Sequence, residues 1–273
     1  MRFALFNSQT DVTDPRKPLT ISESVGAPLL EVCVETLPEA LQAVAAGADR
    51  LEVCAAMSES GTTPSIGLVE AILEHVKVPV FVMIRPRGGD FLYSAGEIDV
   101  MLRDIEAARA SGAHGIVSGA LDANGTIDQE GTEALLEAAA PLPFTFHRAF
   151  DMTRDLDESL DVLMAIGASR VLTSGGAETA LAGVPVLSRL CVRAGQRLVI
   201  IAGGGVRSPH IAAIAANTGV REFHIGARKL VQTRMRYRPS AARVNKEMNV
   251  EEGEWFETDS AELAASVAAL RGP

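Results

Sequence analysis

The sequence contains few cysteines and no long apolar run, and each scarcity excludes a class of protein. Three cysteines among 273 residues do not make a disulfide framework, and the odd number fits a reducing cytoplasm. No segment approaches the roughly 18 to 20 consecutive apolar residues that a membrane-spanning helix requires. The first residues lack the apolar stretch and small-residue cleavage pattern of a secretory signal. We therefore expect a cytoplasmic protein that does not enter a membrane.

Clustered basic residues are also lacking. The formal net charge is −10, from 25 Lys and Arg residues against 35 Asp and Glu residues. Because a nucleic-acid backbone or an anionic membrane surface requires concentrated positive charge, neither is expected as a partner. The densest basic run, residues 234–243, lies near the acidic residues 250–257. Together these two runs predict a charged surface segment.

Apolar residues, in contrast, are abundant. Hydrophobic residues make up 47% of the chain and charged residues 22%, which is ample material for a large core. Residues 1–28 are polar and contain three prolines, so they predict an N-terminal extension outside the core. The remaining residues, 29–273, have a length typical of one α/β barrel domain.

Short apolar runs alternate with longer amphipathic segments from residue 29 onward. The runs predict eight strands, at residues 29–34, 50–55, 79–85, 115–119, 143–149, 170–175, 197–203 and 221–226. The segments between them predict helices, three of which end at Gly47, Gly112 and Gly167. A helix end, a Gly-Ala pair and a strand recur in that order at residues 47–53, 112–118 and 167–173, which indicates one repeated unit.

Eight strand-and-helix units predict a single-domain (β/α)8 TIM barrel. The competing architecture is an open, doubly wound sheet, which usually has fewer strands and a glycine fingerprint after the first strand. No G-x-G-x-x-G follows residues 29–34. The pattern therefore favours the closed barrel.

The first two strands share the triplet Glu-Val-Cys, at residues 31–33 and 52–54. Side chains of a strand alternate between its two faces, so one face of each strand is apolar and the other carries a carboxylate and a thiol. In a barrel the apolar face packs against the helices. The polar face, with Glu31, Cys33, Glu52 and Cys54, is then expected to point into the barrel.

Other polar residues lie at or after the carboxyl ends of the predicted strands, where barrel enzymes place their active sites. The candidate catalytic residues are Glu31, Glu52, Arg85, Arg87, Asp90, His147, Arg148, Asp151, Thr173 and His224. Burial of such groups is costly unless they are paired. The alternative interpretation is an ion-pair layer that only fills the barrel.

Glycines follow the seventh and eighth strands, at the loops that often bind phosphate in barrels. The candidate anion-binding residues are Ser174, Gly203, Gly204, Gly205 and Gly226. Arg207, Arg228 and Lys229 lie near them in the sequence. The alternative interpretation is that these glycines only form tight turns.

Cys33 and Cys54 occupy equivalent places on neighbouring strands, so their sulfurs are expected to lie close together. Two thiolates suit Cu(I) or Zn(II). A buried free cysteine is more often only a small apolar residue, and no C-x-x-C motif is present. Cys191 lies in a helical pattern and is expected to serve packing alone.

Several motifs resemble the CutC family of copper homeostasis proteins. They are LLEVCV (29–34), GADRLEVCAA (47–56), GTTPSIG (61–67), IRPRGGDFLYS (84–94), TFHRAFDM (145–152), RVLTSGG (170–176) and MRYR (235–238). The resemblance implies a cytoplasmic (β/α)8 barrel that forms a homo-oligomer, either a dimer or a tetramer. It also implies a link to copper tolerance or trafficking, with Cu(I) bound by Cys33 and Cys54. Residues 1–28 and the cations after the eighth strand depart from the family pattern.

Three functions remain open at the level of sequence. The first is a copper homeostasis protein that binds Cu(I) and needs no organic cofactor. The second is a barrel enzyme of lyase, isomerase or hydrolase type, in which Arg85 and Arg87 hold a phosphorylated or carboxylated metabolite and Glu52 or His147 acts as acid or base. The third is a non-catalytic scaffold.

Overall fold

The computed structural model describes residues 27–237 and 253–272. Most of the expected N-terminal extension, residues 1–26, and part of the expected charged segment, residues 238–252, lie outside the described residues. None of the helices within the described ranges has both the length and the apolar character needed to cross a bilayer.

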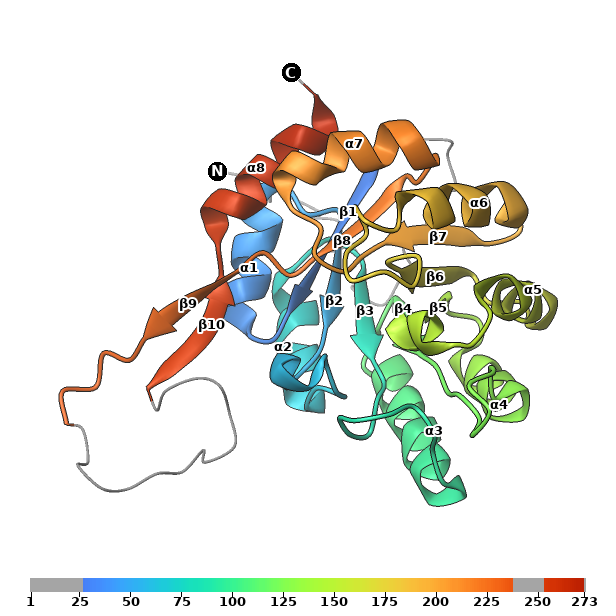
Figure 1. Ribbon diagram of the computed structural model, residues 1–273. Helices are drawn as coiled ribbons and strands as arrows, with labels where there is room; N and C mark the ends of the chain where they lie inside the picture. The colour runs from blue at the N-terminus through green and yellow to red at the C-terminus, as the bar shows by residue number, and fades with distance from the viewer. Residues whose placement is uncertain (1–26, 238–252, 273) are drawn as a thin grey trace, which may run out of the picture.

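Eight parallel strands close into a barrel, in sequence order, and confirm the predicted fold. Each strand pairs with the next along the chain, and the first pairs with the eighth (Figure 1). The strands are β1 (Leu29–Val34), β2 (Arg50–Val53), β3 (Val80–Met83), β4 (Gly115–Ser118), β5 (Phe144–Phe146), β6 (Arg170–Thr173), β7 (Val199–Ala202) and β8 (Glu222–Ile225).

Helices surround the barrel and follow the strands (Figure 1). They are α1 (Leu37–Ala46), α2 (Ile66–His75), α3 (Ala95–Ala110), α4 (Gln129–Ala139), α5 (Leu156–Ile166), α6 (Val184–Ala194), α7 (Ser208–Thr218) and α8 (Ser260–Arg271), with short 3₁₀ helices η1 (Met57–Glu59) and η2 (Arg148–Met152). Local signals fix their ends. Thr36 caps the start of α1, and Gly47 ends it in a left-handed conformation with φ of 102°. These are the helix boundaries that side-chain capping and glycine favour.

The two faces of the strands pack as the alternation predicts. Leu30, Val32 and Leu51 belong to the large core shared with the helices. Cys33, Cys54 and Phe81 belong to a separate buried cluster inside the barrel. A barrel interior that is usually filled by branched aliphatic residues therefore carries sulfur and charge here.

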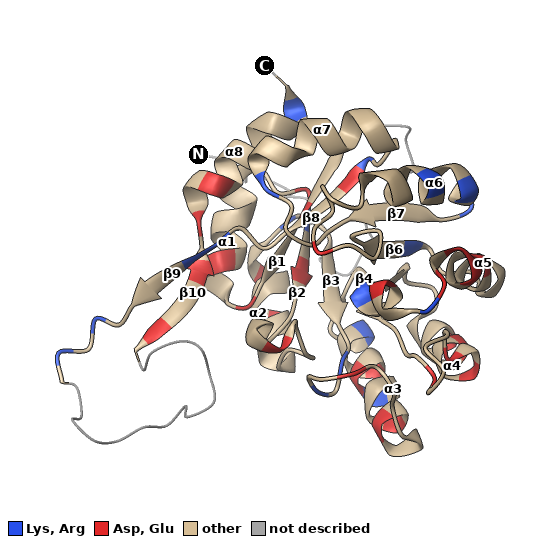
Figure 2. Ribbon diagram, in the orientation of Figure 1, with Lys and Arg blue, Asp and Glu red and all other residues tan. Residues whose placement is uncertain are grey.

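A two-stranded antiparallel hairpin follows the barrel strands and was not predicted. Its strands are β9 (Arg228–Gln232) and β10 (Glu254–Thr258), and it projects away from the barrel before the chain returns to α8 (Figure 1). Along the described ribbon, positions of Lys and Arg alternate with positions of Asp and Glu (Figure 2).

Candidate functional site

Three sulfur atoms meet inside the barrel near the carboxyl ends of β1 and β2. The Sγ atoms of Cys33 and Cys54 lie 2.9 Å apart, and the Sγ of Cys33 lies 3.5 Å from the Sδ of Met57. Both cysteines are free thiols and fully buried, whereas Met57, in η1, is half-buried. The parallel register pairs Cys33 with Glu52, and Cys54 follows directly after β2 on the same inward-facing parity as Glu52. The repeated triplet thus brings both thiols into contact.

The environment of this pair favours the neutral thiol in the absence of metal. The hydrogen bond with Cys54, together with burial, raises the pKa of the Cys33 thiol well above its usual value. Because a metal binds the thiolate, metal binding must displace the proton. Metal–sulfur bonds of about 2.3 Å also require the two sulfurs to separate beyond their present contact. With these adjustments the donor set fits a soft ion such as Cu(I).

A layer of charged residues lies beside the sulfur cluster. The Nε of Arg50 donates to Glu31 Oε2 at 2.5 Å, and its Nη2 donates to Glu222 Oε2 at 2.6 Å. The Nε of Arg170 lies 3.4 Å from the same Glu222 oxygen. Burial alone would raise the pKa of Glu31, but Arg50 and His224 lower it to about 2. These contacts form an ion-pair layer inside the barrel.

His224 links two carboxylates across β1, β2 and β8. Its Nδ1 lies 2.7 Å from Glu31 Oε1, and its Nε2 lies 3.8 Å from Glu52 Oε2. Burial opposes the charged imidazole, but Glu52 and Glu31 raise the pKa of His224 above its usual value. Burial raises the pKa of Glu52. The Oε1 atom of Glu52 has no hydrogen-bond partner among the described residues.

Arg85 and Arg87 lie in the loop after β3 and bind their own chain. The buried guanidinium of Arg85 donates to the carbonyl oxygens of Glu59, Gly61 and Gly89. Arg87 is half exposed and pairs with Asp90 at 3.0 Å and with Glu97 at 2.6 Å. These contacts connect the loop after β2 to the loop after β3 and to the start of α3.

Asp151 joins the loops that follow β5 and β6. Its carboxylate accepts hydrogen bonds from the Thr173 hydroxyl, from the backbone N–H of Ser174 at 3.0 Å and from that of Gly176 at 2.9 Å. Arg148 pairs with Asp151 at 2.8 Å and donates to the Ser174 hydroxyl at 3.0 Å. These four predicted site residues, Arg148, Asp151, Thr173 and Ser174, therefore form one network.

His147 lies in the barrel interior apart from the two carboxylates that surround His224. Its ring packs against the edges of Phe91 and Phe146. Burial and the charge of Arg85 lower the pKa of His147 to about 3. Its Nε2 atom finds no hydrogen-bond partner within the described part of the chain.

This histidine predicts a pH dependence of stability. The folded imidazole titrates at about 3 and the unfolded one near 6.5, so between these values the unfolded chain binds more protons. The free energy of unfolding should fall by about 1.4 kcal/mol for each unit that the pH decreases through this window. His147→Gln should flatten the curve, and His75→Gln, at an exposed position, should not. Urea unfolding at several pH values measures both; equal slopes for wild type and His147→Gln would refute the assignment.

Two of the glycines after β7 have left-handed backbone conformations, and one of them lies close to Arg148. Gly204 and Gly205 have φ of 92° and 64°, and a Cβ atom on Gly204 would come within 2.9 Å of Arg148 Nη1. The first N–H of α7, at Ser208, donates to Glu262 at 2.7 Å. The Glu262 carboxylate thus occupies the N-terminus of α7.

The other predicted glycines are placed differently. Gly203 packs closely on Leu172, where a Cβ atom would meet Cδ1 at 2.4 Å. Gly226 leads into β9 and not into a short helix. Arg228 forms an ion pair with Glu35. The loop after β8 therefore lacks the helix terminus that the phosphate prediction assumed.

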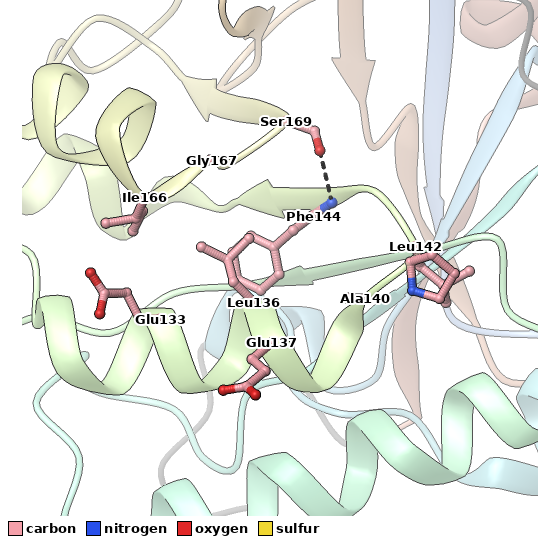
Figure 3. A pocket seen from close by; sticks show the side chains of 10 residues that line it. Glu133, Leu136, Glu137, Ala140, Leu142, Phe144, Ile166, Gly167 and Ser169 are labelled. Atoms are coloured by element: carbon pink, nitrogen blue, oxygen red, sulfur yellow. Dashed lines mark hydrogen bonds between the residues drawn. The ribbon is translucent and has the colours of Figure 1, made fainter.

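A separate cavity of about 390 Å³ lies between α4 and α5 (Figure 3). It includes Phe144, at the start of β5, and Ser169, just before β6. It is therefore at the opposite end of the barrel from Cys54. The sequence analysis did not identify it, and none of the predicted site residues lines it.

Arg50 and Arg170 are site residues that the sequence analysis missed. Arg50 is separated from Glu52 by one residue, so strand alternation places both in the interior. Arg170 begins β6 in the same way. The signal in the sequence was their inward-facing parity at the amino ends of the strands, whereas active sites of barrels lie at the carboxyl ends.

Comparisons with known proteins agree with the fold and with the family that the sequence resembles. The profile of the CutC family matches residues 28–229. A copper homeostasis protein cutC homolog of Homo sapiens is 45% identical over 224 residues, covering 82% of each chain. A CutC family protein of Mesorhizobium japonicum is 46% identical over 255 residues, covering 93% of this chain and 98% of its own.

A solved structure also matches. The CutC protein of Streptococcus agalactiae superposes with a TM-score of 0.70 at 35% sequence identity, covering 72% of this chain and 97% of its own. The matched region of the family profile contains the whole barrel from β1 to β8 and both strand cysteines. On these grounds the chain belongs to the CutC family.

Proposed function

We propose that this protein binds Cu(I) inside the barrel through Cys33 and Cys54 and acts in copper homeostasis in the cytoplasm. The observation that supports this most strongly is the 2.9 Å contact between the two buried Sγ atoms. The relatives named for copper homeostasis support the same conclusion. Copper is cargo in this proposal, and no organic cofactor takes part.

Met57 gives the buried thiols a path to the surface. Its sulfur contacts Cys33, and its backbone N–H donates to Glu35 Oε1 at 2.8 Å, which fixes the loop over the sulfur pair. The flanking residues Ala56 and Ser60 have φ of 48° and 66°, conformations that are strained in residues other than glycine. We infer that Cu(I) passes from the Met57 thioether to the two thiolates, which lose their protons as the ion binds.

Stoichiometry tests the proposal. Anaerobic titration with Cu(I), in competition with a chromophoric chelator, should give one tightly bound ion per chain. Prior oxidation of the two thiols to a disulfide should abolish that binding, and reduction should restore it. Tight binding that survives disulfide formation would place the copper elsewhere.

The hairpin of β9 and β10 supports a homo-oligomer, either a dimer or a tetramer. Leu230, Trp255 and Phe256 are about half exposed, and an isolated two-stranded ribbon is marginally stable in water. Lys229 lies opposite Glu257, on the same face of the ribbon as Trp255, whereas Leu230 and Phe256 lie opposite each other on the other face. The Trp255 face therefore offers both charges to a second copy. Self-complementarity of this kind is what a twofold interface requires.

The hairpin surface predicts a change in assembly. Trp255→Glu combined with Phe256→Glu should convert the oligomer to a monomer, because charge replaces the apolar contacts. Light scattering coupled to gel filtration measures the mass. Val192→Glu, at an exposed position of α6, is the matched control and should leave the mass unchanged. If the hairpin variant keeps the mass of the wild type, the hairpin is not the interface between subunits.

A barrel enzyme for a small phosphorylated or carboxylated metabolite is the second candidate. The observation that favours it is the guanidinium of Arg148 beside Gly204, in a loop whose glycines allow backbone N–H groups to approach an anion. Crystals soaked in inorganic phosphate test it. A phosphate ion bound between Arg148 and Gly204 would support the enzyme candidate. If no anion binds at this loop, the proposed anion-binding site is wrong.

A further inference from the structure

A carboxylate, an imidazole and a second carboxylate cluster at β1, β8 and β2, beside the sulfur pair. One ligand atom each of Glu31, His224 and Glu52 lies within 4.8 Å of the others. Glu31 Oε1 contacts the Nδ1 of His224 at 2.7 Å, and the opposite ring nitrogen, Nε2, faces Glu52 Oε2 at 3.8 Å. The Nε2 to oxygen separation is too long for a hydrogen bond.

In the layer of charged residues that the structure describes, the Glu52 carboxylate has no arginine partner. Arg50 pairs with Glu31 and with Glu222, and Arg170 pairs with Glu222. None of the ion pairs between described residues joins Glu52 to an arginine. Glu52 is only 2% exposed, and its Oε1 has no partner in the described chain. A buried carboxylate in this state is costly, and a cation would offset the cost.

The geometry points to a site for a divalent cation of the Zn²⁺ class, held by His224 Nε2 and the Glu52 carboxylate. Imidazole nitrogen and carboxylate oxygen are ligands that Zn²⁺ accepts, and binding releases the Nε2 proton of His224 to solvent. A metal-binding histidine commonly donates its other N–H to a carboxylate, which fixes the ring and strengthens the ligand. Here Glu31 is the carboxylate beside the Nδ1 atom of His224. The guanidinium of Arg50 in turn binds the other oxygen of Glu31. Water completes the coordination.

This site is distinct from the proposed copper site because its ligands are oxygen and nitrogen. Glu52 lies between the two, since its carboxylate is also within 4.8 Å of the Sγ atoms of Cys33 and Cys54. A soft monovalent ion would select the sulfurs, and a borderline divalent ion would select the histidine and carboxylate. The barrel interior therefore offers two neighbouring metal positions of different chemistry.

The test uses the full chain with Cys33→Ser and Cys54→Ser, so that thiol chemistry cannot contribute. Calorimetric titration with Zn²⁺ should show one ion per chain. Adding Glu52→Gln or His224→Gln should remove that binding, whereas His147→Gln, a buried histidine away from the carboxylates, should preserve it. Glu31→Gln should weaken it by roughly 10- to 100-fold, the usual effect of losing an outer-shell partner.

A spectroscopic readout covers the case in which a variant does not fold. In the protein with His224 intact and ¹⁵N-labelled histidine, Zn²⁺ should shift the Nε2 resonance of His224 and leave that of His147 in place. No Zn²⁺ binding by the cysteine-free protein, or binding without a change at His224, would overturn the inference. Copper binding by the wild type is measured separately, so either proposal can fail without the other.

Discussion

Replacing both Cys33 and Cys54 by serine is expected to lower the affinity for Cu(I) by more than about 100-fold. Loss of an outer-shell partner alone typically costs 10- to 100-fold, and here both direct soft ligands are removed. A serine hydroxyl is a hard donor that Cu(I) does not favour. Anaerobic competition against a chromophoric chelator measures the affinity of each variant.

Cys191→Ser is the matched control. Cys191 lies on α6, half-buried and outside the barrel interior, and burial raises the pKa of its thiol to about 11. Its replacement should leave Cu(I) affinity unchanged. If the double variant binds as tightly as the wild type, or if Cys191→Ser causes the loss, the sulfur pair is not the copper site.

Arg50→Met should cause the largest loss of stability among single changes in the charged layer. Arg50 is 3% exposed and bridges two carboxylates. Without Arg50, the negative charges of Glu31 and Glu222 lose the guanidinium that both of them bind. Breaking a buried pair in this way typically costs about 3–5 kcal/mol. Urea unfolding, followed by circular dichroism, measures the change in the free energy of unfolding.

Arg103→Met provides the comparison at the surface. Arg103 pairs with Asp99 one helical turn away, and both side chains are exposed, so its loss should change the free energy of unfolding far less than Arg50→Met does. Adding Glu31→Gln and Glu222→Gln to Arg50→Met should recover part of the lost stability, because the unpaired charges are then removed. Similar small costs for Arg50→Met and Arg103→Met would contradict the assigned role of the layer.

The barrel could be predicted because it depends on local patterns that repeat. Each strand of the barrel is a short apolar run, and the helix ends carry glycine where the backbone turns left-handed, as at Gly47 and Gly167. The direction of Glu31 and Cys33 followed from strand alternation alone. The contact between Cys33 and Cys54 followed once the two strands were placed side by side in parallel.

The partners of the charged residues could not be predicted from local pattern. Whether Arg85 binds a ligand or three loop carbonyls depends on how residues 59–61 and 89 fold back over β3. Glu262 reaches the start of α7 from the last helix, 54 residues away. Both contacts are decided by tertiary packing, which a motif at one position does not encode.

The hairpin escaped prediction for a different reason. Residues 228–232 and 254–258 form its strands, but its connection is much longer than the two to five residues of common hairpins. The basic and acidic residues nearby indicated a charged surface and gave no evidence of pairing.

X-ray absorption spectroscopy of the protein loaded with one Cu(I) tests the central claim most directly. The account predicts a first coordination shell made only of sulfur, from Cys33 and Cys54, with Met57 available as a third donor. A shell of nitrogen and oxygen in the loaded wild-type protein would contradict it.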